Sequence, residues 1–460
     1  MSLNLPADCL NEIFEYLKDE DLRSCILVNR LWCETSVRIL WRKIQNFNTL
    51  LTCLPNKSKM ILSENGNLIS DLSSRPPLFY YSSFIKNLCI YDICRSIKRF
   101  INCRCRRPIN LESVEKNQQI MVMMEHELFK MLMNQTSLKS LYFDIYNMNI
   151  PNIPFINYPG AEDSLRDLSE LKCSSNTSYK LSQICLNLRS LKIIFQSRTS
   201  NELAELVSVQ NNLKNLELDF QYDAKDQSIF FTKIPNTLTK LHIHGRSVCI
   251  PWSFISELSN LQELSLSLVN RMCGLKDFSK LQYANFPQLQ ILKFGYECPD
   301  DENLTKFLEI NGKSLKELIL CENIHCSINL DIGNFCPNLR SLCTMFSDGN
   351  VELLKVIFDG CQQLESIDVL RCDYFLDESI LLEIVVEFSP KMFHELSVDL
   401  GIDVSPETTF QWGLRSILKR WANRVPCIPL SLTASLCSEL DIEFSKSNIK
   451  IIKEFRKLSV

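Results

Sequence analysis

Glycine is scarce in this sequence, with 11 residues among 460. Loops that cradle phosphate groups depend on glycine, because a side chain would hold the backbone away from the phosphate. Neither G-x-x-x-x-G-K-S/T nor G-x-G-x-x-G occurs in the chain. We therefore expect no bound nucleotide, and we expect no other cofactor.

Catalytic signatures are missing as well. The chain has 5 histidines, no G-x-S-x-G and no H-E-x-x-H. It also lacks a cysteine–histidine pairing with a recognisable local pattern. We expect a protein that is not an enzyme. An active site assembled from scattered residues remains an alternative.

An excess of positive charge and long apolar runs are both lacking. The net charge is −4, whereas a general nucleic-acid binder is usually basic. No apolar run approaches the ~20 residues that a membrane helix needs, and the first residues do not resemble a signal peptide. The 21 cysteines are therefore expected to be reduced, buried thiols of a cytoplasmic and/or nuclear protein.

The first forty or so residues carry the pattern of short amphipathic helices. Leu10, Ile13, Phe14 and Leu17 recur at the spacing i, i+3, i+4 and i+7, which places them on one helical face. Apolar residues continue at such spacings in later helices, at Leu22, Cys25, Ile26, Val28 and Trp32. So small a bundle cannot bury them all. The surplus must be covered by the following domain, as for a helical cap, or by a separate protein.

Most of the remaining chain repeats the motif L-x-x-L-x-L, with aliphatic or small substitutes. From Leu138 onward, successive copies lie 30, 20, 25, 25, 23, 28, 26, 24, 25 and 29 residues apart. This spacing is close to the period of roughly 20–29 residues that is typical of leucine-rich repeats. The copies begin at Ile85, Leu138, Leu168, Leu188, Leu213, Leu238, Leu261, Leu289, Leu315, Leu339, Leu364 and Phe393.

The end of each predicted helix is also marked in several copies. Cys185, Cys336 and Cys361 lie three residues before the first position of a copy, and Pro235 and Pro390 take the same place. The pattern resembles the cysteine-containing leucine-rich repeat. We predict that these residues end a helix before the chain turns into the next strand.

The spacing predicts an α/β fold, a leucine-rich-repeat solenoid over residues 85–400 with an insertion at about 91–114. Strands stack about 4.8 Å apart, whereas helices need roughly 10 Å, so the strand–helix horseshoe curves with its strands inside. The motif leucines point into the core, and the residues between them face the concave side. Residues 47–84 are a transition, and residues 401–460 a C-terminal cap with a last strand at 428–432 and a closing helix.

The N-terminal segment resembles an F-box over about residues 3–46. The resemblance rests on Leu5-Pro6, on Asp21-Leu22, on the V-x-x-x-W motif that ends at Trp32, and on Leu40-Trp41. Asp8 and Asn29 depart from the glutamate and cysteine that are common in the family, but neither change removes an apolar contact.

The resemblance implies an all-helical F-box domain at residues 1–46 that binds a Skp-type adaptor and, through it, a cullin scaffold. Such a chain is the substrate receptor of an SCF-type ubiquitin ligase, and it supplies proximity rather than catalysis. A repeat scaffold that is not linked to a cullin is the alternative. The candidate adaptor contacts are Leu5, Pro6, Leu10, Ile13, Phe14, Leu17, Leu22, Val28 and Trp32.

Residues 94–107 combine six basic residues with three cysteines. Zinc sites usually take four ligands from paired C-x-x-C-like units, but Cys103 and Cys105 are one residue apart and no second pair follows. We therefore expect no metal there. The favoured interpretation is a solvated insertion, and a basic loop for nuclear import or partner binding is the alternative.

Register also predicts which residues face the concave side. His242 and His244 share that face and make only half of a metal site, so partner contacts are favoured. Nine acids accompany four lysines there, which predicts an acidic surface that prefers a basic segment of its target. The lysines are Lys172, Lys192, Lys240 and Lys293, and the acids are Asp144, Glu170, Glu217, Asp219, Glu263, Glu317, Asp368, Glu395 and Asp399. The candidate target contacts are His242 and His244 together with all of these acids except Asp144 and Glu170.

Overall fold

The structure is a computed structural model of the chain. It describes residues 5–64, 77–104, 111–143, 155–175, 179–195, 201–221, 228–246, 251–269, 275–320, 328–346, 350–371, 378–399, 420–424 and 428–435. Two compact units divide the chain. Unit 1 comprises Met1–Ile194 and Arg198–Leu213, and unit 2 comprises Phe195–Ser197 and Lys214–Val460.

Unit 1 begins with three short helices, α1 (Ala7–Phe14), α2 (Asp19–Cys25) and α3 (Arg30–Leu40), which we call the hook. The side chain of Asn29 accepts a hydrogen bond of 2.9 Å from the backbone N–H of Trp32 and so caps α3. This explains the asparagine at a position where the family often has cysteine. The hydrophobic core of the hook consists of Leu10, Phe14, Leu22, Cys25, Val37, Leu40 and Trp41, which directly follows α3.

The hook is joined directly to the first repeat. Trp41 packs on Tyr81, with ring centroids 4.4 Å apart. The carbonyl oxygen of Arg42 accepts hydrogen bonds of 3.0 and 2.9 Å from the N–H groups of Lys86 and Asn87. The same arrangement joins successive repeats, as where the carbonyl oxygen of Lys86 accepts hydrogen bonds from the N–H groups of Lys139 and Ser140. The end of the hook thus occupies the place of a preceding repeat and caps the array.

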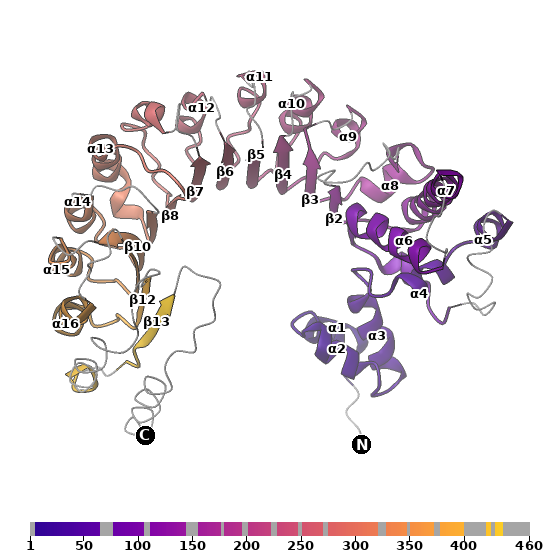
Figure 1. Cartoon of the computed structure of the whole chain (residues 1–460), viewed down its shortest axis with the longest axis horizontal. Coiled ribbons are helices and arrows are strands. Elements are labelled where there is room, and N and C mark those ends of the chain that lie inside the picture. The colour runs from indigo at the N-terminus through magenta and orange to yellow at the C-terminus, as the bar shows by residue number, and fades with distance from the viewer. Residues whose placement is uncertain are drawn as a thin grey trace. The chain divides into compact units, whose positions relative to one another are not determined.

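In the rest of unit 1 the structure describes four strands, which pair in parallel within the pairs β1–β2, β2–β3 and β3–β4. Figure 1 labels β2, β3 and β4. The strands are β1 (Asn87–Cys89), β2 (Ser140–Phe143), β3 (Glu170–Ser174) and β4 (Ser190–Phe195). The helices are α4 (Phe47–Thr52), α5 (Asn56–Glu64), η1 (Tyr81–Phe84), α6 (Ile90–Arg104), α7 (Leu111–Gln135), η2 (Phe155–Asn157), α8 (Ala161–Leu165), α9 (Tyr179–Ile184) and α10 (Asn201–Ser208).

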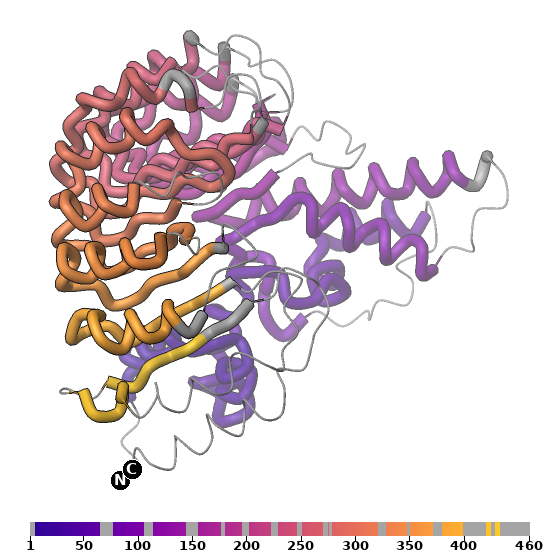
Figure 2. Tube along the Cα trace, turned by 60° about the vertical axis from the view of Figure 1, so that its left-hand side comes forward, coloured from indigo at the N-terminus to yellow at the C-terminus, as the bar shows by residue number. Residues whose placement is uncertain are grey.

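The insertion between β1 and β2 is helical, and the prediction of a solvated segment was wrong for its described part. Helix α6 buries one complete face against its surroundings, and α7 lies beside it (Figure 2). Apolar residues at Ile93, Ile97 and Phe100 recur at helical spacing among the basic residues. Because basic residues are so dense in this segment, the sequence pattern did not indicate that its apolar residues form one buried face of a helix. Residues 105–110 lie outside the described residues.

In unit 2 the structure describes nine strands of the repeats, and each of the first eight pairs in parallel with the next strand along the chain. They are β5 (Asn215–Phe220), β6 (Lys240–Arg246), β7 (Glu263–Val269), β8 (Ile291–Phe294), β9 (Glu317–Leu320), β10 (Ser341–Phe346), β11 (Ser366–Arg371), β12 (Glu395–Asp399) and β13 (Ser431–Ser435).

The connections of unit 2 are short helices that lie on the outer side of its strands (Figure 1). They are α11 (Ser228–Phe231), α12 (Ser253–Ser256), η3 (Lys276–Lys280), α13 (Asp301–Asn311), η4 (Gly312–Ser314), α14 (Ile328–Phe335), α15 (Leu353–Gly360) and α16 (Glu378–Phe388). Strands on the inside and helices on the outside follow from the different widths of the two elements.

All twelve motif copies that the sequence predicted coincide with strands β1–β12. In unit 2, the middle motif residues pair with one another in register, from Leu216 opposite Leu241 to Leu396 opposite Leu432. Their side chains are buried in the core, for example Leu241 and Leu318, which are fully buried. Burial of such a side chain contributes about 1.5–3 kcal/mol. The fold class is therefore confirmed.

Two of the few glycines allow neighbouring repeats to approach closely. A Cβ atom on Gly360 of α15 would lie 1.8 Å from the carbonyl oxygen of Gly333 in α14. Only glycine lets these two helices pack at this distance.

The described part of the predicted C-terminal cap is small. The predicted last strand is present as β13, which pairs with β12. Trp421 is buried and donates a hydrogen bond of 2.9 Å from Nε1 to the carbonyl oxygen of Ile428. The predicted closing helix lies outside the described residues.

Candidate functional site

The structure sorts the nine candidate adaptor contacts by exposure. Leu10, Phe14 and Leu22 belong to the core of the hook, so they hold the hook together. Leu17 and Trp32 are half-buried against the same core. The exposed candidates are Leu5, Pro6, Ile13 and Val28.

Large apolar side chains remain uncovered on the hook. Ile13 is 48% exposed and Val28 56%, although the next residue after Ile13, Phe14, is 2% exposed. Two further residues that the sequence analysis missed are more exposed still, Tyr16 at 88% and Leu27 at 86%. Large apolar side chains that stay exposed on so small a domain are candidates for contact with a partner protein. We call Leu5, Ile13, Tyr16, Leu27 and Val28 the hook surface.

A signal for the two missed residues exists in the sequence. Tyr16 lies off the i, i+3, i+4, i+7 stripe that contains Leu10 and Phe14, so its ring cannot join the same core. Leu27 comes directly before Val28, where the chain leaves α2 and turns toward α3. A large apolar residue off the buried stripe is the pattern that could have identified both.

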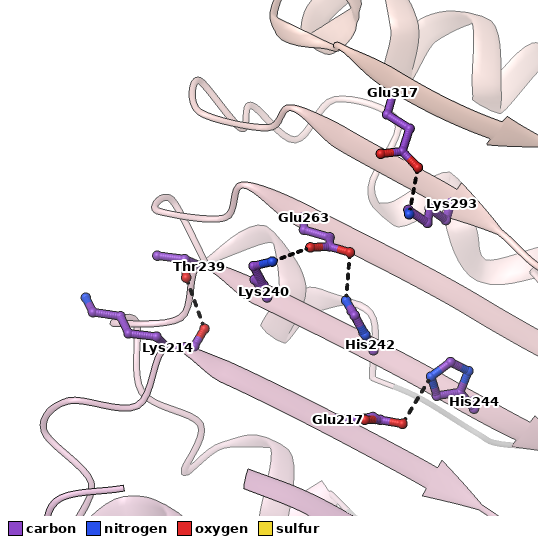
Figure 3. Close-up of polar contacts among 9 residues, drawn as sticks. All are labelled: Lys214, Glu217, Thr239, Lys240, His242, His244, Glu263, Lys293 and Glu317. Atoms are coloured by element: carbon purple, nitrogen blue, oxygen red, sulfur yellow. Dashed lines mark hydrogen bonds and ion pairs between the residues drawn. The ribbon is translucent and has the colours of Figure 1, made fainter. Parts of the chain in front are cut away.

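The second candidate surface is the concave face of unit 2, where charged side chains of adjacent strands meet (Figure 3). Glu263 of β7 lies between two residues of β6. Its Oε2 is 2.9 Å from Lys240 Nζ, and its Oε1 is 3.1 Å from His242 Nε2. The side chains of His242 and Glu263 are thus close together, although the contact is not a well-aligned hydrogen bond. Because the three groups lie on paired strands, the sheet holds them together.

Two further charge pairs flank this cluster (Figure 3). His244 Nε2 lies 3.5 Å from Glu217 Oε1 on β5, and Lys293 Nζ lies 2.7 Å from Glu317 Oε1 on β9. We call Glu217, Lys240, His242, His244, Glu263, Lys293 and Glu317 the concave ladder. Its acids are each paired with a cationic or titratable partner. The sequence count of acids therefore overstated the free negative charge of this face.

The other predicted concave acids are not part of the ladder. Asp219 accepts a hydrogen bond of 2.8 Å from Gln221, and the Cys343 thiol lies 3.8 Å from Asp368. Glu395 is exposed at the start of β12. The backbone of Asp399 belongs to β12, but its side chain, like the whole of Asp144, lies outside the described residues.

The electrostatic environment of Glu263 favours its charged form. Burial raises the pKa of this carboxyl, but the hydrogen bond from Lys240 and the nearby His242 and Lys293 outweigh burial. The pKa of Glu263 is therefore below its ordinary value. Because lysines lie beside Glu263 and Glu317, the ladder is a mixed array of charges rather than an acidic patch.

The described residues contain no group of three or more histidine, cysteine or acidic side chains placed to hold a metal ion. Nor does any helix in the described part of the chain have the length and apolarity to cross a membrane.

Comparisons with known proteins identify the first domain. Residues 2–46 match the F-box-like family, whereas no curated protein matches the chain.

Three similar solved structures are a leucine-rich repeat-containing protein, LegL7, from Legionella pneumophila, the Rad7 and Elc1 complex of yeast, and the Toll–Spatzle complex of Drosophila. The first is 12% identical with a TM-score of 0.34 and covers 63% of this chain and 93% of its own. The second is 15% identical with a TM-score of 0.37, and the match covers 92% of this chain and 91% of the other. The third is 15% identical with a TM-score of 0.26, and the match covers 65% of this chain and 48% of the other.

These structural likenesses are too distant to carry an argument. The assignment rests on the match of residues 2–46 and on the register of the repeat strands. The chain therefore carries an F-box-like domain at residues 2–46, which precedes a leucine-rich-repeat solenoid.

Proposed function

We propose that this chain is the substrate-recognition subunit of an SCF-type ubiquitin ligase. The hook binds a Skp-type adaptor and, through it, a cullin, and the repeats bind target proteins for ubiquitination and degradation. The chain itself is non-catalytic and acts in the cytoplasm and/or nucleus. Its contribution to the reaction is proximity, because it raises the local concentration of the target near the conjugating enzyme.

The observation that carries this proposal is the exposure of the hook surface. The hook already has a filled core, to which Leu10, Phe14 and Leu22 contribute. Ile13, Val28 and their neighbours therefore remain available to a partner. Burial of such apolar side chains at the centre of an interface supplies much of the binding free energy.

The test is adaptor binding by the full chain carrying Ile13→Ala and Val28→Ala together. We expect the dissociation constant for a purified Skp-type adaptor to rise roughly tenfold or more, since interface truncations of this kind cost over 1 kcal/mol. A matched control is Val122→Ala with Met60→Ala, which removes equally exposed apolar groups of unit 1 outside the hook. Equal affinity of the hook variant and the control would contradict the proposal.

Replacement of Leu5 and Pro6 together is a second form of this test. Both residues are exposed at the start of α1, so their loss should abolish adaptor binding while the repeats stay folded. Circular dichroism of the variant checks the fold.

Purification of the chain from cells separates the proposal from its alternatives. Adaptor and cullin together are the expected companions. Adaptor without cullin would instead indicate a repeat scaffold, and the absence of both would contradict a receptor.

Targets of the repeats can be identified by their stabilisation. Deletion of residues 1–46 should uncouple the repeats from the ligase, so target proteins should accumulate and be detected by quantitative mass spectrometry. We propose that the concave ladder, with Asp219, Asp368, Glu395 and Asp399, contacts these targets. Replacement of His242 and His244 by alanine should then weaken the capture of a target so identified.

A further inference from the structure

Helix α6 has two chemically opposite faces. Ile93, Ile97 and Phe100 are buried on one face, which holds the helix in place. Arg95, Lys98 and Arg99 are exposed, and their spacing of i, i+3 and i+4 places them on one face. We call these three cations the basic face of α6. Their Cα atoms span about 6 Å along the helix axis, given a rise of about 1.5 Å per residue.

The basic face has no charge partner among the residues that the structure describes. In the part of the chain that the structure describes, neither Arg95, Lys98 nor Arg99 forms an ion pair or a side-chain hydrogen bond.

Two other helices pair a lysine with a nearby acid. Lys306 Nζ lies 2.6 Å from Glu302 one turn earlier in α13, and Lys355 forms an ion pair with Glu352. On α6, in contrast, Arg95 has cations both three and four residues later. Like charges at these spacings repel and destabilise a helix. Such an uncompensated local conflict is typical of a functional surface.

We propose that the basic face of α6 binds an acidic segment of a partner protein. Arginine and lysine side chains bind carboxylates through charge-assisted hydrogen bonds, and arginine can do so with two parallel bonds. Carboxylates spaced one helical turn apart match cations at i, i+3 and i+4. This site is separate from the hook surface and does not depend on adaptor binding.

Membranes and nucleic acids fit the basic face less well. A helix that lies on a membrane needs an apolar face toward the lipid, whereas the apolar residues of α6 are buried in the protein. Tight binding to nucleic acid usually involves more phosphate contacts than three cations offer, and the chain as a whole has a net charge of −4.

The test uses the full chain and a fluorescein-labelled helical peptide with glutamates at i, i+3, i+4 and i+7. A peptide with glutamine in place of each glutamate is the control probe. At low salt, fluorescence anisotropy should show that the chain binds the glutamate peptide and does not bind the glutamine peptide. The affinity for the glutamate peptide should fall as the salt concentration is raised. In the triple variant Arg95→Gln, Lys98→Gln, Arg99→Gln, which we call the basic-face variant, the affinity of the chain for the glutamate peptide should fall at least tenfold.

A control variant removes the same charge elsewhere, at the exposed and scattered Lys130, Lys233 and Lys391. Its affinity for the peptide should stay within twofold of the original chain. Unfolding temperatures of both variants verify that they are folded. Equal binding by the basic-face variant, or the absence of binding by the original chain, would overturn the proposal. The proposal would also be overturned if the original chain bound duplex DNA or phosphatidylserine vesicles more tightly than the glutamate peptide and the basic-face variant lost that binding.

Discussion

Buried thiols serve this chain as packing groups and weak hydrogen-bond donors. The Cys361 Sγ atom lies 3.2 Å from the carbonyl oxygen of Cys336, and Cys185 Sγ lies 3.9 Å from that of Leu165. Burial is the largest cause that raises the pKa of Cys185 and Cys361, to about 12 in each case. These thiols are therefore protonated over the physiological pH range. The thiolate is the reactive form, so burial also removes their reactivity.

Alkylation at pH 8 should separate the thiols by burial. We expect iodoacetamide to modify the exposed Cys9 and Cys103 in the folded chain, and to leave Cys185 and Cys361 unmodified. At a pKa of about 12, roughly one molecule in ten thousand carries a thiolate at pH 8. Peptide mass spectrometry measures each site, and labelling in denaturant is the control. Modification of Cys361 as rapid as that of Cys9 would contradict the expectation.

Glu263 should make the stability of the chain depend on pH. Its folded-state pKa is below the ordinary value of 4.5, so its charge stabilises the fold at pH above 4.5. That contribution is lost as the pH falls below 4.5 and through the lower folded-state value. In the variant Glu263→Gln, we expect the free energy of unfolding to change less between pH 7 and pH 3 than in the original chain.

Urea unfolding at the two pH values measures this difference, and Glu395→Gln is the matched control because Glu395 is exposed. Identical pH dependence in all three chains would show that the Lys240–Glu263–His242 contacts do not stabilise the fold.

At the scale of the repeat element, buried side chains tie the end of one helix to the preceding repeat. Gln210 follows α10 and is fully enclosed. Its Oε1 accepts a hydrogen bond of 3.0 Å from the Leu188 N–H, and its Nε2 donates one of 2.6 Å to the carbonyl oxygen of Cys185. Gln210 occupies the position that Cys185, Cys336 and Cys361 occupy in their repeats. A thiol or an amide can therefore donate a hydrogen bond from this position, although Pro235 and Pro390 show that not every repeat uses a donor there.

Replacement of Gln210 by alanine should destabilise unit 1. The N–H group of Leu188 and the carbonyl group of Cys185 lose their amide partner inside the protein, and an unpaired buried polar group costs about 1–3 kcal/mol. We expect a decrease of that size in the free energy of unfolding, measured by urea titration. Gln363→Ala removes an exposed amide and should have little effect. A similar loss in both variants would rule out this role for the buried amide.

At the scale of the whole molecule, the hook has two roles. Its core and Arg42 close the open end of the repeats, and its outer apolar residues remain exposed. A repeat array needs such an end cap because a terminal repeat has no neighbour to cover its core and its strand edge. Adaptor binding and the stability of the first repeat are therefore properties of the same segment.

Deletion of residues 1–46 should loosen the first strand. The N–H groups of Lys86 and Asn87 lose their acceptor at Arg42, so their hydrogen exchange should accelerate by at least tenfold. The N–H groups of Thr239 and Lys240, which bind the Lys214 carbonyl in unit 2, serve as the internal control. Unchanged protection at Lys86 and Asn87 would contradict the capping role.

Local pattern was sufficient to predict the repeats. Alternation along each strand and the return of leucine every 20 to 30 residues depend only on neighbouring positions, so strands β1–β12 could be placed from the sequence. The hook helices were predictable for the same reason, because Leu10 and Phe14 repeat at the period of a helix. The F-box-like match confirms that assignment.

Exposure and charge pairing were decided only by the tertiary structure. Ile13 and Phe14 are adjacent and both apolar, and only the packing of three helices determines which one is buried. His242 meets Glu263 because β6 and β7 pair in register, a contact between residues far apart in sequence. The sequence by itself therefore determined the strands, the helices and the order of the domains. The folded chain decided which surfaces are free to bind, because burial and ion pairs depend on neighbours that the fold brings together.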